Sequence, residues 1–102
     1  MAQFDVFRNP RRGPFPLLLD VQAELLSDLA TRIVVPMSPK KTWAAARLSR
    51  LNPIATVDRI EYVLVFQEMA AVPVTMLGEP VASLAKRRVD LIAALDVLFT
   101  GV

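Results

Sequence analysis

The side chains that most often carry enzyme chemistry are missing from this sequence. It contains no histidine and no cysteine. Zinc sites of the usual kind and Ser–His or Cys–His nucleophiles are therefore excluded, because they need an imidazole or a thiolate. The three glycines, Gly13, Gly78 and Gly101, are isolated from one another, so no glycine-rich phosphate loop is present. The sequence predicts no catalytic centre, no metal site and no cofactor.

Carboxylates are the remaining candidates for acid–base catalysis, but their spacing does not single out a pair. We interpret them as solvated or strand-edge charges, and we expect a protein that is not an enzyme. The residues considered are Asp5, Asp20, Asp58, Glu61, Glu68 and Glu79.

Basic residues form two groups that suit binding better than catalysis. One group is Arg8, Arg11 and Arg12, in a segment rich in proline. The other surrounds Trp43 and consists of Lys40, Lys41, Arg47 and Arg50. The net charge is only +2, which is too small to indicate general nucleic-acid binding. Solubilising charge is the favoured interpretation, and contact with nucleic acid or an acidic peptide is the alternative.

The C-terminal segment, residues 89–102, organises the elements that must position any binding site. Its leucines recur at helical three- and four-residue steps, at Leu91, Leu95 and Leu98. Only Asp90 and Asp96 interrupt the apolar run, and they do not share a helix face. We therefore expect a helix that a barrel or sheet covers on one side and a second chain on the other. Gly101 supplies the permissive backbone that ends it.

Short extended segments precede this helix. Strands are predicted at residues 3–8, 17–21, 32–37, 53–57 and 60–66, with a hairpin turn at Asp58-Arg59. Residues 68–77 are predicted to form a strand pair or one bent strand, and residues 38–51 mostly a loop. Residues 22–29 form a short helical turn or a loop, in which Leu25 and Leu26 are either buried or exposed for a partner. The pattern predicts an α+β fold in one domain, residues 1–102: a small, partly closed barrel with strands over about 3–77 and a helix over about 84–99.

Bulk composition supports association between copies of the chain. The chain of 102 residues is 54% hydrophobic, with a mean hydropathy of +0.42. This is high for a small interior, so we interpret the excess as interface, most simply in a homodimer. No secretory signal or apolar run of membrane-spanning length is visible, which predicts a cytoplasmic protein without membrane contact.

Five stretches of the sequence resemble the CcdB family of toxins from toxin–antitoxin pairs. They are QFDVF at the N-terminus, LDVQ at 19–22, RIVVPM at 32–37, MAAVPVTMLGE at 69–79 and LFTGV at the C-terminus. The resemblance implies a homodimer of SH3-like barrels, each with a C-terminal helix. It also implies a toxin that binds the DNA gyrase A subunit and traps the enzyme with cleaved DNA. A CcdA-like antitoxin would neutralise the toxin, and the complex of the two would repress their operon. Operator DNA would be contacted only through that complex, and no small-molecule substrate is expected.

The resemblance also assigns residues to sites. Gyrase contacts are expected at Leu25, Leu26, Asp96, Thr100, Gly101 and Val102. The dimer interface is expected at Met69, Ala70, Val72, Leu98, Thr100 and Val102. A basic surface that bears a tryptophan would suit a disordered acidic antitoxin segment, which points to Arg8, Arg11, Arg12, Lys40, Lys41 and Trp43.

Two departures from the best-known members bear on the gyrase contact. Those members carry tryptophan where this chain has Thr100 and asparagine where it has Asp96. The loss of an indole removes an apolar anchor of the kind that often dominates interface energy. Weaker or differently tuned target binding is expected.

Two rival functions stay open. The MazF/Kid-type toxins use the same fold to cleave messenger RNA, which here would need the basic residues at positions 8, 11 and 12 gathered over a dimer groove. The MAAVPV block and the terminal Thr-Gly-Val favour the gyrase branch. The second rival is a decayed toxin that retains only antitoxin binding and operon regulation.

Overall fold

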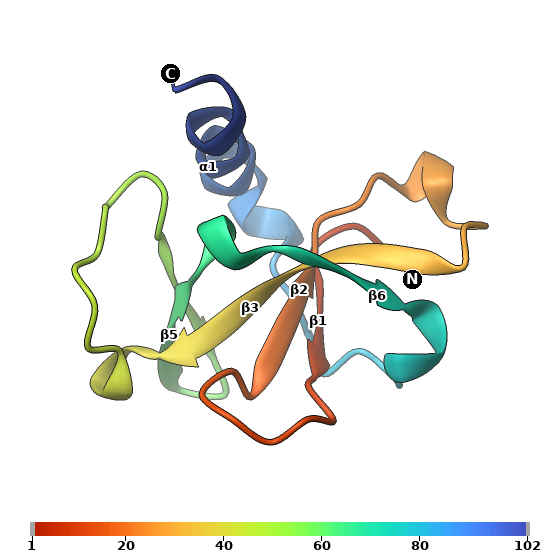
Figure 1. Ribbon diagram of the computed structural model, residues 1–102, viewed down its shortest axis with the longest axis horizontal. Coiled ribbons are helices and arrows are strands. Elements are labelled where there is room, and N and C mark those ends of the chain that lie inside the picture. Colours follow the sequence, from red (N-terminus) through yellow and green to blue (C-terminus); the bar gives the residue numbers. More distant parts are fainter. Residues whose placement is uncertain (1, 102) are drawn as a thin grey trace.

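The fold is a small, nearly closed antiparallel β-barrel with one C-terminal α-helix, as Figure 1 shows in a computed structural model that describes residues 2–101. The described residues form a seven-stranded sheet in the order β4-β5-β3-β2-β1-β7, with β6 also paired to β3. The prediction of an α+β, SH3-like barrel is confirmed.

The strands are β1 Asp5–Arg8, β2 Leu17–Asp20, β3 Thr31–Pro39, β4 Ile54–Val57, β5 Ile60–Leu64, β6 Ala70–Pro73 and β7 Ala82–Ser83. The helices are the short 3-10 turns η1 Glu24–Leu26, η2 Lys40–Thr42, η3 Phe66–Glu68, η4 Val74–Met76 and η5 Ala85–Arg87, and then α1 Arg88–Thr100.

Strand β3 is the centre of the sheet. It pairs with β2 along one edge, and its other edge is shared by β6, opposite residues 31–34, and β5, opposite residues 37–39. Pro36 has no N–H to donate and lies between these two pairings. Because two different strands use one edge of β3, the sheet bends into a barrel instead of staying flat.

The β4–β5 hairpin turns at Asp58 and Arg59, as the sequence predicts. Both residues have positive φ, 51° and 68°, which is the signature of the primed turns that match strand twist. This turn forms without the glycine that usually favours it. The antiparallel pairing of Val57 with Ile60, which closes the hairpin, offsets the backbone strain of the turn.

The predicted strands differ from the structure by one or two residues at their ends, and the differences at the first strand and in residues 68–77 have a clear physical cause. The first begins at Asp5 and not at Gln3, because Phe4 is held in a left-handed conformation (φ 71°) with its side chain in the core. The segment 68–77 is neither a strand pair nor one bent strand. Its single strand β6 ends at Pro73, and the turn η4 follows.

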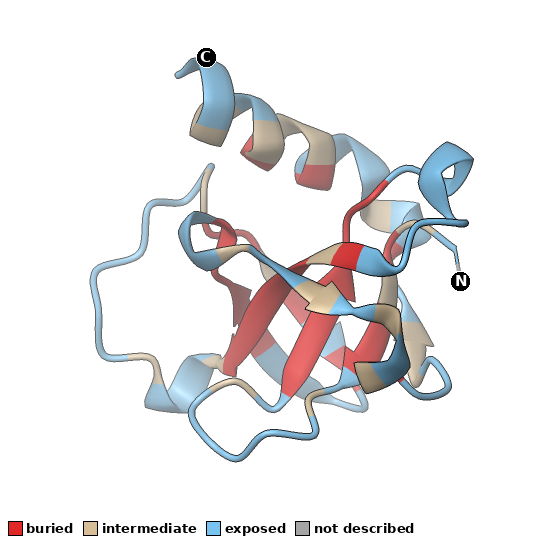
Figure 2. Cartoon of the chain, turned by 45° about the vertical axis from the view of Figure 1, so that its right-hand side comes forward, coloured by how far each residue is buried: buried red, intermediate tan, exposed pale blue. Residues whose placement is uncertain are grey.

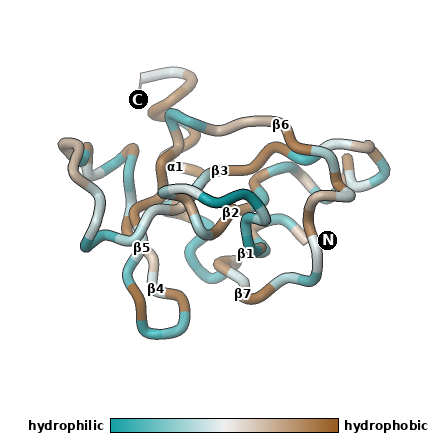
Figure 3. The backbone as a smooth tube through the Cα atoms, turned by 60° about the horizontal axis from the view of Figure 1, so that its bottom comes forward, coloured by the Kyte–Doolittle hydropathy of each residue, from teal (hydrophilic) through white to brown (hydrophobic). Residues whose placement is uncertain are grey.

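Helix α1 lies across one end of the barrel and buries only the face that points to the sheet (Figure 2). Leu91 and Ala94 enter the main core, whereas Val89 is 83% and Phe99 71% exposed. Hydrophobic residues run through the middle of β3 and over much of α1, which leaves the helix without a continuous polar face (Figure 3). The expectation that the barrel covers only one side is confirmed. Gly101 ends the helix at φ 75°, and its N–H donates to the Val97 carbonyl at 3.0 Å.

No helix within residues 2–101 is both long enough and apolar enough to cross a membrane.

We predict that Leu91→Ala lowers the free energy of unfolding by about 2–5 kcal/mol, because it opens a cavity under a fully buried side chain. The matched control is Val89→Ala, on the exposed side of the same helix, for which we expect a change within about 0.5 kcal/mol. Urea unfolding monitored by circular dichroism measures both. Equal losses for the two variants would contradict the packing described here.

Candidate functional site

An apolar groove lies where the last turns of α1 meet the η1 turn, β3 and the start of β6. Its volume is about 420 Å³. We call it the apolar groove; its lining residues are Val21, Gln22, Ala23, Leu26, Ile33, Met69, Leu95 and Phe99. These residues come from segments that are far apart in the sequence, so only the folded chain brings them together.

Large apolar side chains at this groove are exposed to solvent. Leu26, 45% exposed, and Phe99, 71% exposed, line the groove, and Leu25, on the same turn but outside the lining, is 92% exposed. The sequence left open whether the leucine pair is buried, and the structure places both on the surface. The η1 turn buries none of its three residues. A connected apolar surface of this kind on a small protein is typical of an interaction site.

A buried ion pair supports the η1 turn from below. Arg32 donates from Nε to Asp20 Oδ2 at 2.9 Å, and its Nη2 lies 2.7 Å from the same oxygen. Arg32 Nη2 also donates to the Gln22 carbonyl at 3.1 Å. Both charged side chains are fully buried, so neither exchanges its partner for water. Arg32 Nη1 has no partner among the described residues.

Gln22 transfers this support to the turn. Its Oε1 accepts from the Ile33 N–H at 3.1 Å, and its Nε2 donates to the carbonyls of Leu26, at 3.2 Å, and Thr31, at 3.3 Å. The Gln22 N–H in turn donates to Asp20 Oδ1 at 3.0 Å. The η1 turn is thereby tied to β3 at the floor of the apolar groove.

The interpretation of Asp20 as a solvated charge is wrong. Burial raises the pKa of its carboxyl group, and the hydrogen bonds from Arg32 and from the Gln22 backbone act in the opposite direction. The sequence held a signal for this pair: one carboxylate in the apolar run LLLDV, and one arginine at the start of RIVVPM. From the sequence alone, each residue is interpreted as a charge at the end of a strand. The two residues come together because β2 and β3 pair side by side.

At the helix tip, Thr100 folds back on the helix. Its Oγ1 donates to the Asp96 carbonyl at 2.6 Å, so its hydroxyl group is already engaged within the helix. The Asp96 side chain is exposed and lies outside the apolar groove, beside a shallow hollow with Val89, Ile92 and Ala93. Val102, expected in both the gyrase and dimer contacts, lies outside the described residues.

The residues expected at the dimer interface line different hollows of the single chain. Met69 lines the apolar groove, and Leu98 is half-buried against the main core. Ala70 and Val72 instead border a second groove of about 180 Å³, together with Leu18, Val34 and Met76 among others. Thr100 is exposed at the tip.

The residues expected to contact the antitoxin fall into two places. Arg8 is exposed at the end of β1, Arg11 and Arg12 are exposed in the loop between β1 and β2, and Arg11 borders the second groove. Lys40 and Lys41 are exposed on η2, where Lys40 Nζ lies 3.8 Å from Glu61 Oε1, and Trp43 follows half-buried. Within residues 2–101 no three acidic side chains come close enough together to hold a metal ion.

A small SH3-like barrel that exposes a connected apolar surface at its terminal helix defines a module for binding another protein. A family model described as CcdB protein matches residues 3–101 of the chain. The protein therefore belongs to the CcdB family, whose members are toxins of toxin–antitoxin pairs that act on DNA gyrase.

We predict that Asp20→Ala costs about 3–5 kcal/mol of unfolding free energy, because it leaves the Arg32 guanidinium buried without a counter-charge. The double variant Asp20→Leu/Arg32→Met removes both charges and is expected to lose far less. Thermal and urea unfolding of both variants measure the difference. A loss below about 1 kcal/mol for Asp20→Ala would show that the pair does not support the turn.

Proposed function

We propose that this toxin acts as a homodimer that binds the A subunit of DNA gyrase and holds the gyrase–DNA complex in its cleaved state. Gyrase performs the chemistry, and the toxin shifts gyrase's equilibrium by binding the cleaved state more tightly than the others. The chain itself performs no catalytic step in this proposal. The contact surface consists of Leu25, Leu26, Asp96, Thr100, Gly101 and Val102.

The observation that carries the proposal is the exposure of Leu26 and Phe99 in an apolar groove, with Leu25 exposed on the adjoining turn, in a chain of this family. Burying such side chains against a partner stabilises the complex by roughly 1.5–3 kcal/mol each. Thr100 replaces the family's tryptophan and turns back onto Asp96. We therefore propose that Phe99 provides the aromatic anchor at the tip.

For the homodimer we propose an interface that contains Met69, Ala70, Val72, Leu98, Thr100 and Val102, of which Thr100 and Val102 are shared with the proposed gyrase contact. A CcdA-like antitoxin would contact the basic residues Arg8, Arg11, Arg12, Lys40 and Lys41 together with Trp43. The complex of toxin and antitoxin would repress their operon, and operator DNA would be contacted through that complex. The protein would act in the cytoplasm, where gyrase is found.

We predict that purified protein makes linear, gyrase-linked DNA accumulate when it is added to gyrase, supercoiled DNA and ATP. Leu25→Asp should reduce this product at least about tenfold, because it places a charge in an apolar contact. Deletion of residues 100–102 should do the same. Val89→Asp is the matched control: it adds the same charge to an exposed apolar site near the other end of the helix, and it should leave the product unchanged.

Absence of linear DNA at high protein concentration would overturn gyrase poisoning. Antitoxin binding with no growth defect would then favour the decayed-toxin alternative, which Thr100 motivates. RNA degradation by the purified protein without gyrase would favour the MazF-like alternative. Equal losses for Leu25→Asp and Val89→Asp would show that the groove is not the contact.

A further inference from the structure

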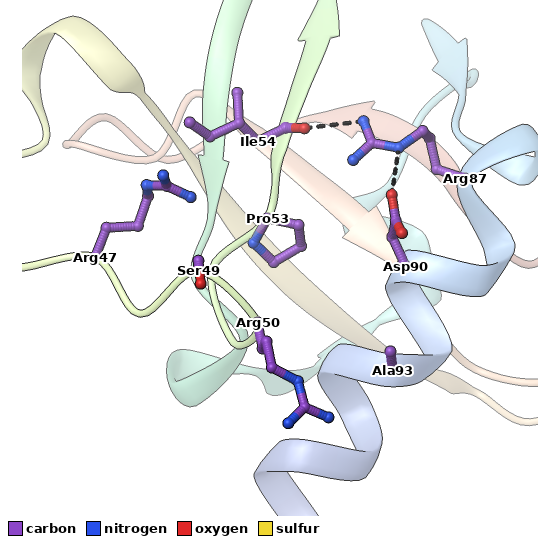
Figure 4. A pocket seen from close by; sticks show the side chains of 8 residues that line it. All are labelled: Arg47, Ser49, Arg50, Pro53, Ile54, Arg87, Asp90 and Ala93. Carbon is purple, nitrogen blue, oxygen red and sulfur yellow. Dashed lines mark hydrogen bonds and ion pairs between the residues drawn. The ribbon is translucent and has the colours of Figure 1, made fainter. Parts of the chain in front are cut away.

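Another hollow, of about 320 Å³, lies near the start of α1 (Figure 4) and shares no lining residue with the apolar groove. One wall is the segment from Arg47 to Ile54, and the other is formed by Arg87 and the first turns of α1. We call it the basic notch; its lining residues are Arg47, Ser49, Arg50, Pro53, Ile54, Arg87, Asp90 and Ala93. Three guanidinium groups face one carboxylate here, so the notch carries an excess of positive charge.

Two of the three arginines are held in place by the fold. Arg87 donates from Nη1 to the Ile54 carbonyl at 2.9 Å and from Nε to Asp90 Oδ2 at 3.1 Å (Figure 4). Arg47 donates from Nη1 to the Asn52 carbonyl at 3.2 Å. Arg50 forms no ion pair within residues 2–101. The arrangement is therefore oriented in advance, with one free guanidinium.

Buried Asn52 fixes the loop that carries Arg47 and Arg50. Its Nδ2 donates to the Leu64 carbonyl at 3.2 Å and to Gln67 Oε1 at 2.7 Å. Its Oδ1 accepts from the Leu48 N–H at 3.2 Å. A loop that serves only to solubilise the chain has no need of this internal anchor.

The sequence around the loop lacks compensating charge. From residue 29 to residue 57 the chain contains no aspartate or glutamate. Asp90 is already engaged by Arg87, so the exposed side chains of Arg47 and Arg50 are left with no acidic partner in the notch and can accept a carboxylate from outside. Planar guanidinium groups match a carboxylate in a bidentate arrangement.

We propose that the basic notch binds an acidic side chain from an extended segment of a partner protein. The walls formed by Pro53, Ile54 and Ala93 suit the methylene groups of a glutamate and an apolar neighbour. A nucleic-acid backbone is a poorer occupant, because a continuous polyanion would run past the carboxylates of Asp90 and Asp96 on the same helix. This site is separate from the proposed gyrase contact and does not depend on it.

The test is fluorescence anisotropy with a short labelled peptide in which glutamate alternates with alanine. Arg47→Gln/Arg50→Gln should weaken its binding at least about tenfold, because two charge-assisted contacts are lost. The charge-matched control is Arg59→Gln/Lys86→Gln, which changes two exposed residues outside the notch and should weaken binding less than about threefold. Arg50→Gln alone removes no side-chain hydrogen bond within residues 2–101. It should weaken binding of the peptide while leaving the thermal stability of the protein unchanged.

Three outcomes would overturn the inference. The first is an equal loss in the notch variant and in its control, which would show non-specific attraction. The second is equal binding of a peptide with glutamine in place of glutamate. The third is tighter binding of labelled duplex DNA with the same arginine dependence, which would make the notch a nucleic-acid contact. None of these assays contains gyrase, so a failure here is distinct from a failure of gyrase poisoning.

Discussion

The placement of the apolar groove depends on one buried ion pair. Asp20 on β2 and Arg32 on β3 are both excluded from solvent, and such a pair is tolerable only when geometry and further hydrogen bonds compensate for lost hydration. Gln22 supplies those bonds and connects the pair to the η1 turn. The atoms of this network therefore fix both the register of β2 against β3 and the position of the exposed leucines.

Helix α1 serves the core and the surface at once. Leu91 and Ala94 close one end of the barrel, while Val89 and Phe99 point away from it. The helix has 13 residues, so its ends are about 20 Å apart at 1.5 Å per residue. The basic notch lies at its start and the apolar groove at its end. The two surfaces differ in chemistry, which suits two different partner segments on one small domain.

Much of the fold follows from local pattern. The terminal helix, its glycine stop, the strand RIVVPM and the hairpin at Asp58-Arg59 were all predictable, because each depends on periodicity or turn position within a few residues. The errors have two origins, one in distant packing and one in the local effect of a proline. Phe4 takes a left-handed conformation because the core holds its ring, and β6 is cut short where Pro73 removes a donor.

The amino-acid sequence predicts the terminal helix and most of the strands, excludes imidazole and thiolate chemistry, and indicates the family. It also showed that the terminal helix has no polar face, since hydropathy is a property of the residues alone. The tertiary structure is needed to show which apolar residues are exposed, such as Leu25 and Phe99, and which charged residues are buried, such as Asp20. The physical reason is that burial depends on which segments pack across one another. Such contacts join residues far apart in the chain, and no local pattern encodes them.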